Sequence, residues 1–445
     1  MQIYFVNFEL ISIKANSHEM KTEGAMAYIW VKANSCIGAF SKARFFIEKD
    51  EWSITKFINV SPVVREIYLN YPDGLKLFDQ AESIGYAITY IGWNKEIIEP
   101  LEFNFKIPEK IDRGQFYKNS KPLYNKGVCL HFNSGEECDF IIEAHSIQKS
   151  QSLSSIAVNG HVYQPKFKQM RCFYSLTGIK KTSTFRGFCK LHDDALFKPI
   201  DTNILLPNEE QAFLYAYRSI CREIFIKNRA LNVFNTAILA FNNKDCAEVI
   251  SLQNLSKGTL NAINQLNTIK KDYDKTAKSK DFHDIKYLVF KSNQIQNIAF
   301  SGLIFPDYDF QGEFLQNVAI VESKLSLLTF CSAPMENGWG IIFAWHQESS
   351  GASDAFISSL AQVVADGKSI EDCLFRFIIK CCENHALSPT WWDALPEIHK
   401  KKILDCINEN ADPLVLTSSD YLTQGLEKIV DWQLNSVITN IRKIN

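Results

Sequence analysis

No run of apolar residues in this 445-residue sequence approaches the roughly 20 residues that a membrane-spanning helix needs. The most apolar segments, residues 339–345 and 375–382, have only the length of a strand or a helix face. Residues 1–14 alternate apolar and polar side chains instead of running apolar after a basic start, which predicts a strand and not a signal peptide. These absences predict a cytoplasmic protein without membrane contact.

Internal repeats and low-complexity tracts are also missing from the sequence. Hydrophobic residues make up 46% and charged residues 22%, which excludes wholesale disorder. Because the chain is several times longer than a usual domain, we expect about two to four domains. The mixture of strand-period and helix-period segments predicts a multidomain α+β protein.

Residues 1–95 are predicted to form a ferredoxin-like α+β domain, because segments with strand period are interrupted by two helical ones. Ser35 is expected to cap the first helix. The expected strands are 2–13, 25–33, 52–60, 63–69 and 86–93, and the expected helices are 37–48 and 73–85.

Residues 96–115 are expected to connect this domain to a Cys- and His-rich module at 116–200. Residues 201–445 are predicted to form an α+β C-terminal region, through which a protein partner could bind. Its expected helical hairpin comprises 208–245 and 256–279, its β-meander the strands 287–290, 295–304, 318–322, 325–332 and 339–345, and its later helices 352–366, 369–383, 396–408 and 418–441.

Twelve cysteines without an export signal should be mostly reduced thiols. Nine lie in apolar contexts, where free cysteine behaves as a small buried hydrophobe. Cys129, Cys138 and Cys189 instead lie among polar residues and glycines, and Cys189 is followed by His192. Zinc prefers four such ligands in a tetrahedron, so these four side chains predict a structural zinc site. The alternative is that they are only buried thiols and a buried histidine.

Several features of the surrounding sequence bear on this zinc site. Gly135 would allow the loop between the first two cysteines to fold back. The acids after His192 predict the start of a helix. His131 is expected to be exposed, and His161 is expected at the edge of a strand.

His145 remains over once zinc has four ligands, and it follows an apolar strand in the sequence Ile-Glu-Ala-His-Ser-Ile. With this histidine, the cysteines and the helix that opens at Cys189, residues 124–200 resemble the HNH (ββα-metal) nucleases of the treble-clef zinc group. The resemblance implies that His145 is a general base and that Asp193 binds a catalytic Mg²⁺ or Mn²⁺. It also implies a role for Glu143 near that metal.

The sequence departs from the HNH pattern at two positions. Ala144 stands where an acidic residue commonly precedes the key histidine, although strand alternation would place Glu143 on the same face as His145. The middle asparagine has no clear counterpart ahead of Cys189, and Asn159 could substitute for it from the loop.

Each residue of this predicted centre also has a simpler interpretation. His145 could be a zinc ligand or a hydrogen-bonded core histidine. Glu143 could face solvent, and Asp193 with Asp194 could simply favour a helix N-terminus.

Residues 116–200 have a formal charge of +6, although the net charge of the chain is −2. A basic segment within an otherwise acidic chain is typical of a surface that contacts phosphates. The alternative is that a lysine-rich window is only solvated surface. The expected nucleic-acid contacts, with DNA favoured over RNA, are Lys149, Lys166, Lys168, Lys180, Lys181 and Arg186.

Two functions are therefore predicted. The first is metal-dependent phosphodiester hydrolysis by an HNH-like centre, of the kind found in restriction or phage-defence effectors. The second is a non-catalytic module in which zinc shapes a surface that binds nucleic acid or protein.

Overall fold

The computed structural model describes residues 2–12, 24–50, 52–69, 71–93, 127–168, 171–241, 247–318, 324–409 and 418–441. The chain forms two compact units, one of residues 1–123, 231–258 and 413–416, the other of residues 124–230, 259–412 and 417–445. Helices and antiparallel sheets occur in both, which confirms the α+β multidomain class. Residues 96–115, the expected connector, lie outside the described ranges. No helix in these ranges has the length and apolar character needed to cross a bilayer.

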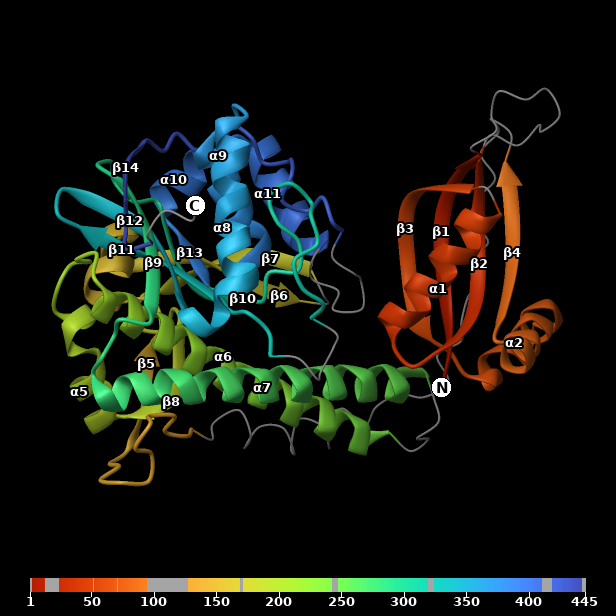
Figure 1. Cartoon of the computed structure of the whole chain (residues 1–445), viewed down its shortest axis with the longest axis horizontal. Coiled ribbons are helices and arrows are strands. Elements are labelled where there is room, and N and C mark those ends of the chain that lie inside the picture. The colour runs from red at the N-terminus through yellow and green to blue at the C-terminus, as the bar shows by residue number, and fades with distance from the viewer. Residues whose placement is uncertain are drawn as a thin grey trace. The chain divides into compact units, whose positions relative to one another are not determined.

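The first unit contains a four-stranded antiparallel sheet in the order β3-β1-β2-β4 (Figure 1). Its helix α1 begins where expected, because the Ser35 side chain accepts a hydrogen bond from the Gly38 N–H. Helix α2 ends at Gly85, whose φ of 95° suits glycine. The elements are β1 (Gln2–Ser12), β2 (Gly24–Ala33), α1 (Cys36–Lys49), β3 (Trp52–Pro62), η1 (Arg65–Tyr68), α2 (Pro72–Ile84) and β4 (Tyr86–Trp93).

The two helices of this unit cover opposite faces of the sheet. Even-numbered residues of β1, such as Val6 and Phe8, pack with Ala43 of α1. Phe5 on the other face packs with Phe78 of α2. The chain order is therefore β-β-α-β-α-β with one helix on each face, which differs from the β-α-β-β-α-β order of a ferredoxin-like layer.

The expected strand at 63–69 is wrong. Residues Arg65–Tyr68 form the short helix η1, and Tyr68 is buried against Trp30 with a centroid distance of 5.9 Å. Burying this ring in the core beneath α2 favours a turn over an extended edge strand.

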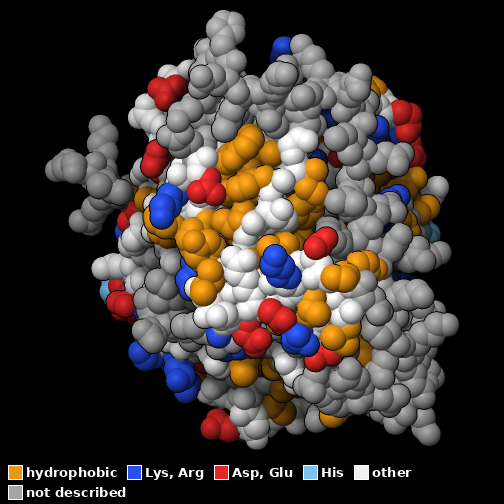
Figure 2. Space-filling view, turned by 90° about the vertical axis from the view of Figure 1, so that its right-hand side faces the viewer, with side chains coloured by type: hydrophobic (Ala, Val, Ile, Leu, Met, Phe, Trp, Pro, Cys, Tyr) orange, Lys and Arg blue, Asp and Glu red, His pale blue; other side chains and the backbone are white. Residues whose placement is uncertain are grey.

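The side of the molecule at which β4 and α2 are labelled in Figure 1 faces the viewer in Figure 2. Hydrophobic side chains gather in the central part of this view, with acidic and basic side chains interspersed.

The second unit is built on an eight-stranded sheet in the order β14-β9-β12-β11-β10-β13-β6-β7. A separate two-stranded sheet pairs β5 with β8. The strands are β5 (Ile141–His145), β6 (His161–Lys168), β7 (Arg171–Gly178), β8 (Thr184–Cys189), β9 (Ile285–Ser292), β10 (Ile298–Ile304), β11 (Leu328–Met335), β12 (Gly338–His346), β13 (His385–Leu387) and β14 (Leu434–Thr439).

The helices of the second unit include two that continue into the first. Residues 231–258, which belong to the first unit, contain the end of α6 and the beginning of α7. The helical elements are η2 (Lys149–Leu153), α4 (Ser154–Ile156), α5 (Lys190–Asp201), α6 (Glu209–Ala240), α7 (Ala247–Ser279), η3 (Gln347–Ser349), α8 (Ser350–Ala365), α9 (Ile370–Cys381), α10 (Pro389–Ala394) and α11 (Glu397–Glu409).

Both faces of the eight-stranded sheet are covered. Leu288 and Phe290 of β9 pack in one core with residues of α8 and α9, whereas Val289 of the same strand packs in a second core with residues of α6 and α7. Because both faces are buried, β12 is an almost continuous apolar run, Trp339–Trp345. The second core also contains Phe188 of β8 and Phe197 of α5. The Cys- and His-rich segment is therefore packed against this core.

Most of the elements expected in the second unit are present with shifted ends. The expected helix at 418–441 is wrong, because its last part is the edge strand β14, which pairs with β9. Gly425, Leu426 and Lys428 have positive φ and interrupt helical geometry before it. Most of the expected strand 318–322 lies outside the described residues. Trp392 of α10 is buried.

Gly338 lies in the tight turn between β11 and β12 with a φ of 153°. A Cβ there would be 1.9 Å from the Ser292 carbonyl oxygen. We expect Gly338→Ala to lower the free energy of unfolding by about 1–3 kcal/mol, measured by urea-induced loss of tryptophan fluorescence. Gly351→Ala, at an ordinary 3.7 Å contact inside α8, is the control and should be neutral or stabilising. Equal stability of the two variants would contradict this role of Gly338.

Candidate metal centre and its surroundings

The Cys- and His-rich segment folds around a β-hairpin that leads into a helix. Strands β5 and β8 are antiparallel, although 38 residues separate them in the chain, and α5 begins directly after β8. The extended segment 127–130 also lies beside β8. The N–H groups of Val128 and Leu130 donate to the carbonyl oxygens of Arg186 and Gly187, at 3.0 and 2.9 Å. These backbone bonds place the first cysteine beside the end of β8.

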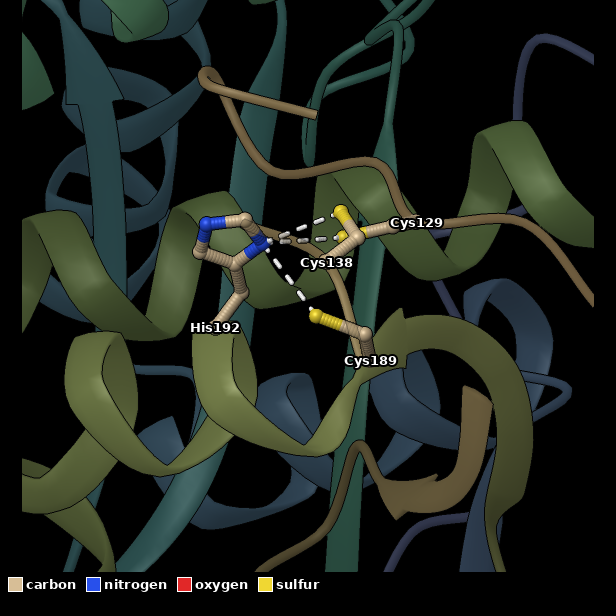
Figure 3. Close-up of side chains that lie close together, drawn as sticks. All are labelled: Cys129, Cys138, Cys189 and His192. Atoms are coloured by element: carbon tan, nitrogen blue, oxygen red, sulfur yellow. Dashed lines mark hydrogen bonds between the residues drawn. The ribbon is translucent and has the colours of Figure 1, made fainter. Parts of the chain in front are cut away.

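Four candidate ligands converge at this end of the hairpin (Figure 3). Cys189 is the N-cap residue of α5, and His192 lies in the first turn of that helix. Cys129 lies in the extended segment, and Cys138 follows a turn at Gly135, whose φ of 94° confirms that the loop folds back there. The predicted set of ligands is therefore brought together.

The distances fit a tetrahedral metal. The Nδ1 atom of His192 lies 3.5, 3.4 and 3.2 Å from the sulfur atoms of Cys129, Cys138 and Cys189. All four ligand atoms lie within 4.8 Å of one another. Zn–S and Zn–N bonds of usual length in a tetrahedron imply an S···N separation of about 3.6 Å. Burial also raises the pKa of the Cys129 thiol to about 11, so a cation is needed to hold it as a thiolate. This Cys₃His cluster could hold a metal ion.

Helices α6 and α7 support the loop that carries Cys129. The Tyr217 hydroxyl donates to Asp274 at 2.6 Å and lies 3.3 Å from the Leu130 carbonyl oxygen, and Lys270 forms an ion pair with Asp274. The loop is thereby attached to the core of the second unit.

The expectation that His131 is exposed is wrong. Its side chain is buried and stacks on the His192 ring, with a centroid distance of 4.0 Å and an interplanar angle of 8°. Burial, then the charges of His192 and Lys270, lower the His131 pKa to about 4, so this ring is neutral. A neutral aromatic ring on the ligand imidazole limits its rotation. Only its position between two ligands could have indicated this from the sequence.

His145 is the last residue of β5 and is not one of the converging ligands. Its Nε2 atom lies 3.0 Å from the Ile179 carbonyl oxygen. A carbonyl only accepts, so Nε2 carries the proton and Nδ1 is the free acceptor. Burial lowers the pKa of His145 below its ordinary value of 6.5, which favours the neutral ring at neutral pH.

Glu143 and Asp193 have different environments. A β-bulge lies between Ile142 and Ala144, and the Glu143 side chain is exposed. Asp193 is 9% exposed, and its buried Oδ1 atom has no hydrogen-bond partner among the described residues. Burial raises the pKa of Asp193 to about 6. Glu143, His145 and Asp193 do not form a second close group of metal-ligating atoms in the described part of the chain.

An ion pair between the buried Arg218 and the partly exposed Asp201 lies near both His145 and Asp193. Arg218 on α6 donates two hydrogen bonds to Asp201, at 2.8 and 2.7 Å, and its side chain is 3% exposed. The charges of this pair act on the pKa of both His145 and Asp193. The prediction from sequence missed Arg218, although one arginine within the buried stretch 212–221 of α6 is a visible signal.

The expected nucleic-acid contacts come from several elements between residues 149 and 186. Lys149, Lys166, Lys180 and Lys181 are exposed, and Arg186 is half-buried on β8. The side chain of Lys168 lies outside the described parts. Asn159, considered above as a substitute for the missing HNH asparagine, lies in an exposed turn with a φ of 50°.

Searches of family models, curated proteins and solved structures find no match to this chain.

We expect the protein, prepared without chelators, to carry about one divalent transition metal per chain, measured by elemental mass spectrometry. Cys138→Ser should lose the metal and lower the melting temperature, because ligation supplies folding energy. Cys36→Ser, which changes a half-buried cysteine outside the cluster, should retain the metal. Metal-free wild-type protein, or full metal content in Cys138→Ser, would refute the site.

Proposed function

We propose that this protein hydrolyses phosphodiester bonds of nucleic acid at an HNH-like centre in which His145 is the general base. The observation that carries the proposal is the orientation of His145 at the end of β5. Its Nε2–H group is held by the Ile179 carbonyl, and Nδ1 remains without a partner among the described residues. The arrangement β5–β8–α5 has the strand, strand and helix order that the resemblance implies.

The proposed reaction uses the neutral imidazole. Nδ1 of His145 accepts a proton from a water molecule while the water oxygen forms a bond to phosphorus. The bond between phosphorus and the leaving sugar oxygen breaks, and that oxygen then takes a proton from solvent. A bound Mg²⁺ or Mn²⁺ would stabilise the charge that develops on the phosphate. The unpartnered, buried Oδ1 of Asp193 is a suitable oxygen ligand for that ion.

The structural metal is proposed to be zinc. Three thiolates and one imidazole match the preference of Zn²⁺ for soft and borderline ligands in a closed tetrahedral site. A knuckle at Cys129 and Cys138, a hairpin and a helix that opens with the remaining ligands together fit a treble-clef-like module.

A non-catalytic role is the second candidate, favoured by two specific observations. Ala144, at the position of an HNH acid, is 3% exposed and packs in the core. The exposed Glu143 and the buried Asp193 do not converge with His145 in the described structure. In this alternative, the zinc cluster only shapes a surface for nucleic acid or a protein partner.

His145→Ala should retain zinc, the fold and nucleic-acid binding while reducing Mg²⁺- or Mn²⁺-dependent cleavage by about 10²–10⁴-fold, the usual effect of losing a positioned base. Cleavage is measured with plasmid and single-stranded substrates. The zinc content and the melting temperature are measured on the same preparations. Since burial lowers the His145 pKa, wild-type cleavage should persist as pH falls to 6.5 and be lost only below that value. His161→Ala changes an exposed histidine at the start of β6 and is the matched control.

The outcomes separate the two candidate functions. Loss of zinc or of folding in His145→Ala would make His145 structural and the mechanism wrong. Wild-type protein that binds nucleic acid but cleaves no substrate with either metal would favour the non-catalytic role.

Lys180→Glu/Lys181→Glu should weaken nucleic-acid binding, because each of these lysines is expected to neutralise a phosphate of the backbone. If both lysines bind phosphates of duplex DNA, the slope of log K against log salt should fall by up to about 1.8. Fluorescence anisotropy at several salt concentrations measures the slope, and Lys278→Glu, an exposed lysine on α7, is the control. An unchanged slope would exclude this pair from the interface.

A further inference from the structure

One face of the hairpin of β6 and β7 is covered at its middle, although Phe167 and Leu176 nearer its ends are 50% and 53% exposed, and the opposite face is open around Phe173. Tyr174 of β7 packs on the buried Trp392 at 4.5 Å and donates to His385 at 2.6 Å. Because side chains alternate along a strand, Phe173 projects from the opposite face, where 42% of it is exposed. Phe173 is directly paired with Lys166 of β6, so an aromatic ring and a cation stand side by side on the open face.

The open face is bordered by the segment that follows His145. Val162 lies four residues before Lys166 and therefore on the same face of β6. It is buried against Leu153 and Ile156. These two residues belong to the short helical stretch that begins at the exposed Lys149. This packing covers the face at Val162, whereas Phe173, paired with Lys166 farther along the strands, remains exposed.

This stretch of the chain carries charge of one sign. Residues 144–192 contain eight Lys and Arg and no Asp or Glu. Arg171, at the start of β7, is exposed. Among the described side chains of this stretch only Lys190 forms an ion pair, with Asp194. The cations around Phe173 are therefore not neutralised by neighbouring acids and remain available to an anionic ligand.

The open face is also connected to the proposed general base. Ile179 comes directly after β7, and its carbonyl accepts the hydrogen bond from His145. At about 3.3 Å per residue, about 20 Å of chain separates Phe173 from this carbonyl. The exposed Lys180 and Lys181 follow it. A polyanion that lies along β7 would reach His145.

We infer that the open face of β6–β7 binds unpaired nucleotides, with a base stacked on Phe173 and the backbone held by Lys166 and Arg171. An exposed ring can stack on a base of any sequence, and cations beside it hold the phosphates. The faces of paired bases are already stacked inside a duplex, so Phe173 distinguishes single strands from duplexes. The inference deepens the proposed function, on which it rests for the nature of the ligand, and names single-stranded nucleic acid as the substrate class.

The test is a binding experiment on the full chain without added Mg²⁺ or Mn²⁺, so that no cleavage is required. Fluorescence anisotropy compares an oligothymidylate of about 20 nucleotides, longer than one stacking groove, with a duplex of the same length. Phe173→Ala should weaken binding of the single strand by about 5- to 100-fold, the effect of losing a stacked base, and should change duplex binding by less than about twofold. Lys166→Ala should weaken both and lower the salt slope for the single strand by about 0.7.

Two further variants control for folding and for general loss of an exposed ring. Phe173→Leu keeps an apolar side chain without a ring face and should bind the single strand as weakly as Phe173→Ala. Phe314→Ala removes a phenylalanine that is 58% exposed elsewhere in the second unit and should bind as the wild type does. Thermal melts confirm that all variants are folded.

Each outcome has a separate meaning for the inference and for the proposed function. Binding of the single strand that is equal in wild type and both Phe173 variants overturns the inference, even if cleavage is observed. Binding of an acidic peptide in place of either nucleic acid also overturns it and assigns the face to a protein partner. Single-strand binding that depends on Phe173, in a protein that cleaves nothing, supports the inference while the hydrolytic function fails.

Discussion

The convergence of Cys129, Cys138, Cys189 and His192, which could hold a metal ion, is the constraint on which the arrangement of the candidate site depends. The loop with Cys129 and Cys138 contacts the rest of the unit through a few hydrogen bonds to β8 and α6. Three sulfur atoms within 3.5 Å of one imidazole nitrogen need a cation between them to be stable as thiolates. A metal would therefore hold the loop to the start of α5 and to the end of β8, whose first residue, Thr184, pairs with His145.

The sheet and helices of the second unit provide a rigid support for this centre. Phe188 and Phe197, on either side of the metal ligands in the chain, are fully buried in the core with α6 and α7. Ser146, next to His145, belongs to a buried network in which Asn384 donates to it and to the Ser301 carbonyl, both at 2.9 Å. The position of the imidazole is consequently determined by the strand pairing, by the Ile179 carbonyl and by contacts to the central sheet.

The buried charges near His145 have a physical cost that only pairing offsets. Arg218 is almost wholly removed from water, and its two hydrogen bonds to Asp201 compensate for the lost hydration. Its guanidinium also lies 4.1 Å above the Phe197 ring, so the same arginine packs against the helix that carries His192 and Asp193. Burial is the main cause of the shifted pKa values of His145 and Asp193, and the charges of this pair add smaller effects of opposite sign.

The sequence by itself determined the α+β class, most helices and strands, and the identity of the four residues that converge in the candidate metal centre. Periodicity, the cap at Ser35 and ligand types at Cys189 and His192 depend on residues close together in the chain. Tertiary structure decided the rest. Residues 434–439 became a strand because β9 offers an unpaired edge, and α1 and α2 lie on opposite faces because both faces of their sheet are apolar. Contacts between segments far apart in sequence decide three further features, and no local pattern specifies those contacts. These features are the stacking of His131, the pairing of Arg218 and the open face at Phe173.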